Sequence, residues 1–184
     1  MSKVLHEGVI YRHIILTVPA MFRPTFSHNA AVVLSAFMQC GAQCLEDCYS
    51  TVKGKPLQGG YITVLHTHGR NGQYHPHLHV LATSGGYDAP GECWEHLQYL
   101  PYALLRRTWQ WHLLTMLRQT LKTEAIDQLV DTCFRTYPDG LVTNVHKGAL
   151  PAQAHSVARY VAKYVVSPPI SVRRMDRYDG ERVT

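Results

Sequence analysis

Five of the twelve histidines fall within a stretch of fourteen residues, at His66, His68, His75, His77 and His79. Clustered imidazoles are more typical of metal ligands than of structural residues. Side chains alternate between the two faces of a β-strand, so His77 and His79 leave the same face. An antiparallel strand before them would bring His66 beside this pair. The sequence therefore predicts a three-histidine site for a divalent ion, with His68 and His75 facing solvent at the loop edges.

Tyr160 and Tyr164 form a second group that could do chemistry. Residues four apart lie on one face of a helix, one turn from each other. A neutral phenol is a weak nucleophile, but a metal that binds the oxygens of a phosphate makes the phosphorus more electrophilic. A histidine metal site and a tyrosine pair together predict attack of a tyrosine oxygen on a phosphate. Lys163, between the tyrosines, is a candidate to contact the phosphate or support the phenolate.

Composition and charge favour a single folded domain that binds nucleic acid. The chain has 184 residues, of which 46% are hydrophobic and 17% are charged, values typical of a globular protein. The net charge of +5 favours an acidic partner, and residues 145–184 contribute +4 of it. The predicted DNA contacts are the basic residues Lys147, Arg159, Arg173 and Arg174.

Two further patterns limit the function classes. No apolar run approaches the length of a membrane span, and the N-terminus has no signal-peptide pattern, so we expect a cytoplasmic protein without a membrane partner. Cys40, Cys44 and Cys48 repeat every four residues, which predicts packing on a buried helix face rather than a disulfide framework or a zinc ribbon. Trp109 is expected in the core. Trp94 and Trp111 fit either packing or a stacking role.

Hydrophobic periodicity and turn residues predict an α+β fold, a central antiparallel sheet with packed helices. A helix that Ser27 or Asn29 caps is expected to run to about residue 49. The pair Gly85-Gly86 is expected to end the third strand. Predicted strands cover residues 9–19, 61–67, 77–83 and 141–146, predicted helices cover residues 29–49, 101–121, 124–134 and 151–166, and a final hairpin covers residues 170–174 and 181–184.

The motif His77-Leu78-His79 resembles the histidine-hydrophobic-histidine hallmark of the HUH endonucleases. With His66 it has the three-histidine spacing of conjugative relaxases in that superfamily, and Tyr160 with Tyr164 resembles the tyrosine pair of rolling-circle initiators and transposases. Taken in this order, the motifs are similar to those of two-tyrosine rolling-circle transposases of the insertion-sequence-91 type. The similarity covers roughly residues 12–184.

The resemblance implies the palm fold of HUH endonucleases, which is similar to that of RNA-recognition modules. It also implies metal-dependent cleavage and transfer of single-stranded DNA at the ends of a mobile element, through a covalent 5′-phosphotyrosine intermediate. Mg or Mn would serve in catalysis, with Zn possible as the bound ion, and the protein would be bacterial, cytoplasmic and nucleoid-associated. The implied metal ligands are His66, His77 and His79, and the implied catalytic residues are Tyr160, Tyr164 and Lys163.

The chain departs from that family in two places. Members normally carry a cysteine-rich zinc-binding segment at the N-terminus, and they usually continue beyond the stretch that corresponds to residues 179–183. We therefore expect residues 1–184 to be a single catalytic domain that lacks both flanking parts.

Two other functions fit part of the pattern. Residues 75–81 also resemble the motif of histidine-triad nucleotide hydrolases and transferases, in which His77 would be the nucleophile without a metal. Pro76 stands where that motif prefers an aliphatic residue, and the tyrosine pair would have no role. The other alternative is a non-catalytic nucleic-acid-binding module with a structural zinc. Activity in EDTA would favour the hydrolase, and metal binding without a covalent DNA adduct would favour the binding module.

Overall fold

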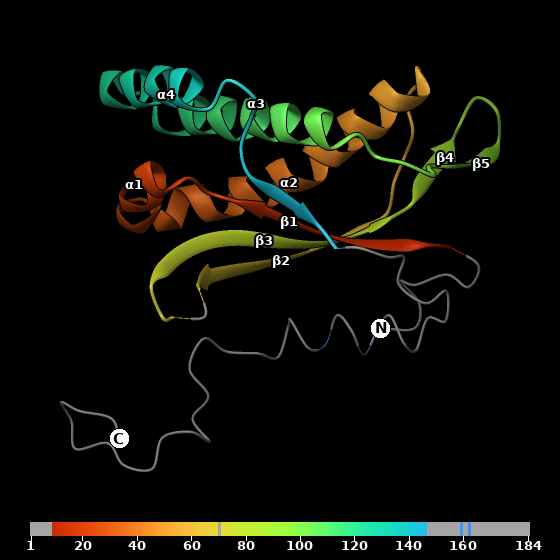
Figure 1. Ribbon diagram of the computed structural model, residues 1–184, viewed down its shortest axis with the longest axis horizontal. Helices are drawn as coiled ribbons and strands as arrows, with labels where there is room; N and C mark the ends of the chain where they lie inside the picture. Colours follow the sequence, from red (N-terminus) through yellow and green to blue (C-terminus); the bar gives the residue numbers. More distant parts are fainter. Residues whose placement is uncertain (1–8, 70, 147–158, 160–161, 163–184) are drawn as a thin grey trace, which may run out of the picture.

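The computed structural model describes residues 9–69, 71–146, 159 and 162. This part of the chain forms the predicted α+β fold (Figure 1). Its elements in order are β1 (Tyr11–Thr17), a 3-10 turn (Ala20–Phe22), α1 (Arg23–His28), α2 (Ala30–Lys53), β2 (Tyr61–His68), β3 (Tyr74–Thr83), β4 (Gly85–Asp88), β5 (Cys93–His96), α3 (Tyr102–Leu121), α4 (Glu124–Thr136) and β6 (Thr143–Val145).

The main sheet has four strands in the order β2-β3-β1-β6, and each neighbouring pair is antiparallel. The predicted hairpin is therefore present as β2 and β3. In this pairing His66 lies directly opposite His77. β1 joins the other edge of β3, with Ile15 opposite His79, and β6 follows β1. Strands that are far apart in the sequence thus meet at the centre of the sheet.

Helices α2 and α3 lie side by side on one face of this sheet, and α4 packs on α3 (Figure 1). Alternation along the strands directs Ile14, Leu16, Leu78 and Val80 toward the helices, and all four are fully buried. Gly41 of α2 lets the helix approach β3 closely, because a Cβ at this position would lie 2.6 Å from Leu78 Cδ1. The opposite face of the central strands carries the histidines.

Trp109 of α3 anchors this core. Its ring is fully buried 5.7 Å from the ring of Phe37, and its Nε1 donates a hydrogen bond to the carbonyl of Thr17 at 3.0 Å. Cys40, Cys44 and Cys48 are buried along α2, as their spacing predicts. Among the described residues, no helix is both long enough and apolar enough to cross a membrane.

The long helix starts after Asn29, one of the two predicted capping residues, but the expected capping bond is not made. Ser27 lies inside α1, and Asn29 precedes α2 without a side-chain capping bond. Asn29 Nδ2 instead donates to the carbonyl of Thr25 at 2.9 Å, so its side chain satisfies the end of α1. The helix also continues to Lys53, where Gly54 in the left-handed region (φ 68°) ends it.

The hairpin β4–β5 was not predicted. β3 ends at Thr83 as predicted, but Gly85, with φ 130°, begins the new strand β4. A side chain there would collide with the carbonyl of Glu95 on β5, so glycine permits the close pairing of the two strands. β3 also begins earlier than predicted, at Tyr74. The predicted helix 151–166 and final hairpin lie outside the described residues, except that Arg159 and Ala162 are helical.

Two tryptophans two positions apart on α3 provide a matched test of the core. Trp109→Ala removes a fully buried ring and should lower the free energy of unfolding by about 3–5 kcal/mol. Trp111, which is 62% exposed, is the control, and Trp111→Ala should change the free energy of unfolding by less than about 0.5 kcal/mol. Urea denaturation followed by circular dichroism measures both. Equal losses in the two variants would contradict this assignment of the core.

Candidate metal centre

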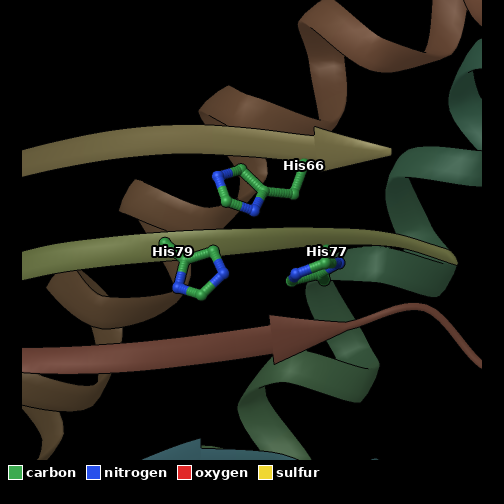
Figure 2. A group of neighbouring side chains, drawn as sticks. All are labelled: His66, His77 and His79. Carbon is green, nitrogen blue, oxygen red and sulfur yellow. The ribbon is translucent and has the colours of Figure 1, made fainter. Parts of the chain in front are cut away.

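Strand pairing brings three imidazoles together on the face of the sheet opposite the helices. His66 on β2 faces His77 on β3, and their ring centroids are 5.3 Å apart. The ring of His79 lies 4.4 Å from that of His66 and 5.0 Å from that of His77. Figure 2 shows the three rings close together, that of His66 beside β2 and those of His77 and His79 beside β3. The structure thus brings together the three residues that are predicted as ligands, and their ligand role stays a prediction.

The spacing of the nitrogens fits a divalent ion. One ring nitrogen from each of the three histidines lies within 4.8 Å of the others. Two nitrogens that bind the same Zn ion, each at roughly 2.1 Å, can be at most roughly 4.2 Å apart. A small inward movement of the rings would therefore allow joint coordination. Three protein ligands leave coordination positions open for substrate oxygens.

A backbone carbonyl determines the tautomer of His77. Its Nδ1 lies 2.7 Å from the carbonyl oxygen of His75. Because a carbonyl oxygen only accepts hydrogen bonds, Nδ1 carries the proton and the neutral ring has its lone pair on Nε2. Metal-binding histidines typically donate their other N–H in this way, which fixes the orientation of the ring.

His79 has a side-chain partner from the neighbouring strand. Its Nδ1 lies 2.8 Å from Nε2 of His13 on β1, and both residues are buried. A lone pair on Nε2 of His79 requires the proton on Nδ1, which then donates to Nε2 of His13. Either ring can donate in this contact, and the arrangement with His79 as the donor is the one that leaves Nε2 of His79 available to a metal.

A row of histidines therefore crosses all four strands of the sheet. The ring of His146, immediately after β6, stacks on that of His13 with centroids 6.2 Å apart, and its backbone N–H donates to the carbonyl of His13. His13 and His146 were not predicted as site residues. Strand parity places His13 on one face of β1, but the sequence does not indicate that β1 lies between β3 and β6.

Burial keeps three histidines of the row, His13, His77 and His79, neutral. It lowers the pKa of His79 to about 3, with further lowering by the nearby His66, His77 and His13. Burial also lowers the pKa of His13 to about 4, with contributions from His146 and His66. The pKa of His77 is lowered by burial as well. Metal ligation requires neutral imidazole, so this environment leaves His77 and His79 in the form that binds metal near pH 7.

A β-bulge separates His68 from the three-histidine cluster. The register shifts between His66 and His68, so His68 pairs with Tyr74 and its ring packs against the ring of Tyr74 at 5.7 Å. His68 and His75 are half-buried rather than fully solvent-facing as predicted. Neither belongs to the ligand set that the geometry brings together.

A second cluster of metal-binding residue types, Asp88, Cys93 and Glu95, lies on the β4–β5 hairpin. Both carboxylates of this cluster form ion pairs with lysine ammonium groups. Lys55 Nζ lies 2.7 Å from Asp88 and 2.8 Å from Glu95. These contacts explain the cluster as a partly exposed ion-pair network on the surface.

The other predicted site residues lie mostly outside the described part of the chain. Arg159 is helical and exposed. Six of the predicted site residues lie outside the part of the chain that the structure describes: Tyr160, Lys163, Tyr164, Lys147, Arg173 and Arg174. Their predicted roles remain predictions.

Comparison with known proteins gives the family. The family described as "Putative transposase" (Y2_Tnp) matches residues 60–184, which include both the histidine cluster and the tyrosine pair. The chain belongs to this transposase family. This agrees with the resemblance that the histidine and tyrosine motifs carry.

Two curated relatives of this chain have transposase names. The chain is 27% identical over 181 residues to the "Transposase for insertion sequence element IS801" of Pseudomonas savastanoi pv. phaseolicola, covering 91% of this chain and 42% of that protein. It is 29% identical over 100 residues to the "Putative transposase y4qJ" of Sinorhizobium fredii, covering 53% of this chain and 25% of that protein. The chain thus spans less than half the length of these relatives. No solved structure matches it significantly.

Replacement of a candidate ligand should weaken Mn binding far more than replacement of the neighbouring His68. His66→Ala, His77→Ala and His79→Ala each remove one candidate ligand and should weaken Mn binding by more than the roughly 10–100-fold typical of losing an outer partner. His68→Ala is the matched control on the same strand and should leave Mn affinity near that of the unsubstituted chain. Calorimetric titration of Mn measures all four. A larger loss of Mn affinity in His68→Ala than in His66→Ala would contradict the assignment of His66 as the third ligand.

Removal of the hydrogen-bond partner of His79 should weaken metal binding while all three candidate ligands remain. We expect His13→Leu to lower Mn affinity about 10–100-fold, since Nδ1 of His79 loses its partner. His13→Gln, whose amide oxygen can accept the same hydrogen bond, should recover much of the affinity. His112→Leu on α3, which breaks the contact of His112 with Asp47, is the control. Equal affinity of His13→Leu and His112→Leu would refute the role of His13.

Proposed function

We propose that this chain cleaves and rejoins single-stranded DNA in a metal-dependent reaction with a covalent 5′-phosphotyrosine intermediate, as in rolling-circle transposition. The observation that carries the proposal is the convergence of His66, His77 and His79 on one face of the sheet, in a chain of a transposase family. A divalent ion at this cluster, Mg or Mn in catalysis with Zn as a possible bound ion, would polarise a phosphate and offset the charge that develops on it.

The residues of the chain would supply the nucleophile and its position. The phenolic oxygen of Tyr160 or Tyr164 forms a bond to phosphorus, and the bond between phosphorus and the 3′-oxygen breaks. The phenol gives up its proton to solvent or a nearby base, and the departing oxygen takes one to become a 3′-hydroxyl. Lys163 would contact the phosphate or support the phenolate. The number of phosphate ester bonds is unchanged, so no external energy source is needed.

The reverse step accounts for strand transfer. A 3′-hydroxyl from the same strand or another one attacks the phosphotyrosine, restores a phosphodiester and releases the phenol. The predicted helix would place both tyrosines on one face, so that the first could hold one strand while the second receives another. A single tyrosine would have to be released before it could cut again.

The proposed partner is single-stranded DNA at the ends of the element, in the bacterial nucleoid. A backbone phosphate of a single strand can approach the ion and a tyrosine in line more easily than one in a duplex. Lys147, Arg159, Arg173 and Arg174 would contribute phosphate contacts, in keeping with the net charge of +5. The family match favours this activity over a histidine-triad hydrolase, which would retain activity in EDTA.

The tyrosine pair gives the decisive test of this function. Tyr160→Phe and Tyr164→Phe each remove only the nucleophilic oxygen, so each single variant should still form an adduct with single-stranded DNA in Mn, with unequal yields. The double variant should form none while binding Mn and DNA normally. Tyr99→Phe, at a residue that is 68% exposed on the surface, is the control and should form a normal yield.

Denaturing gels with labelled oligonucleotide measure the yields, and mass spectrometry locates the phosphotyrosine. A trapped adduct on any residue other than Tyr160 or Tyr164 would eliminate this mechanism. Persistence of the adduct in the double variant would do the same.

A further inference from the structure

A cavity of about 530 Å³ lies between the β4–β5 hairpin and one end of the sheet, and its lining includes residues of the histidine-bearing face. Figure 1 shows the hairpin at this end of the molecule. The floor of the cavity comes from the central strands and its walls from the hairpin and the segment before β2. The residues that contribute the floor and aromatic walls are Tyr11, Ile62, Leu81, Tyr61, Tyr87 and Trp94. Its volume is in the range of small-molecule sites, and its lining is mainly apolar and aromatic.

The cavity floor continues the surface that carries the metal centre. Leu81 follows His79 by two residues on β3, and Ile62 lies directly opposite Leu81. Two residues along a strand correspond to roughly 6.6 Å, and both side chains leave the same face. A strand of DNA whose phosphate lies at the histidines therefore reaches this cavity within one or two nucleotides.

A polar atom of the cavity residues lacks a partner. The Nε1 of Trp94 is buried without a hydrogen-bond partner in the part of the chain that the structure describes. The side chain of Tyr61 instead projects from the helix-bearing face of β2 and lies near Tyr49 of α2. Buried donors without a partner are uncommon in proteins, because they lose their hydrogen bonds to water. Aromatic faces beside a hydrogen-bond donor suit a nucleobase, which offers a flat ring and carbonyl or ring-nitrogen acceptors at its edge.

We propose that this cavity binds an unstacked base of the single-stranded DNA, one or two nucleotides from the phosphate at the metal centre. The inference rests on the proposed function and adds a base-binding subsite to it. The base would contact the rings of Trp94 and Tyr87, and the buried Nε1 of Trp94 would donate to an acceptor at its edge. Bases in a duplex are stacked and paired, so the cavity would also favour single strands.

Binding of a defined probe tests the subsite. The probe is a random-sequence strand of 16 nucleotides with a fluorescent label and 5-iododeoxyuridine in place of thymidine. All proteins compared carry Tyr160→Phe and Tyr164→Phe, so that binding is measured without cleavage. Trp94→Ala and Tyr87→Ala should each lower affinity about 5–150-fold, the range for loss of one stacked base. Trp94→Phe should retain most of the affinity.

Trp111→Ala is the matched control, because Trp111 is an exposed tryptophan on α3. It should leave affinity unchanged, and photocrosslinks should map to Tyr87 or Trp94. Tyr87 is 40% exposed, so its replacement tests the subsite even if Trp94→Ala fails to fold. Affinity unchanged in Tyr87→Ala and in a folded Trp94→Ala variant, with crosslinks only elsewhere, would overturn the subsite.

The subsite and the proposed function can fail separately. If the chain with both tyrosines forms the covalent adduct but the cavity variants bind like the control, only the subsite is wrong. If that chain forms no adduct and the probe does not bind, both proposals fall. If an equal concentration of duplex DNA competed with the probe and prevented the crosslink, that result would also contradict a site for an unstacked base.

Discussion

The pairing register of β2 and β3 is the constraint on which the candidate site depends. With His66 opposite His77, the diagonal neighbour His79 also comes within reach, and three imidazoles meet. A slip of one residue would turn every side chain of one strand to the other face. The core prevents this slip, because Leu78 and Val80 are fully buried against the helices. The packing that stabilises the fold therefore also determines the geometry of the site.

Burial of the histidine row has an electrostatic consequence. Neighbouring imidazoles would repel one another if they were charged, and burial further disfavours the charged form. Hydrogen bonds compensate for the lost solvation at two points, the carbonyl of His75 for His77 and the ring of His13 for His79. His77 and His79 are therefore neutral, and their hydrogen bonds orient the rings, as a metal ion requires.

Local rules predicted much of the site, and non-local contacts determined the rest. Alternation along a strand was sufficient to place His77 and His79 on one face and His66 beside them. The contribution of His13 was missed because it depends on β1 inserting between β3 and β6, which no local pattern encodes. The position of His68 depends on a bulge. The β4–β5 hairpin was missed because Gly85 reads as a strand end, yet here it permits close strand pairing.

The most direct test of the account is a crystal of the full chain soaked in Mn, with data collected at the Mn absorption edge. The account predicts one strong anomalous peak within bonding distance of ring nitrogens from His66, His77 and His79, with Nδ1 of His79 still directed at His13. A peak at Asp88, Cys93 and Glu95 with none at the histidines would contradict it. So would a peak coordinated by His68 in place of His66.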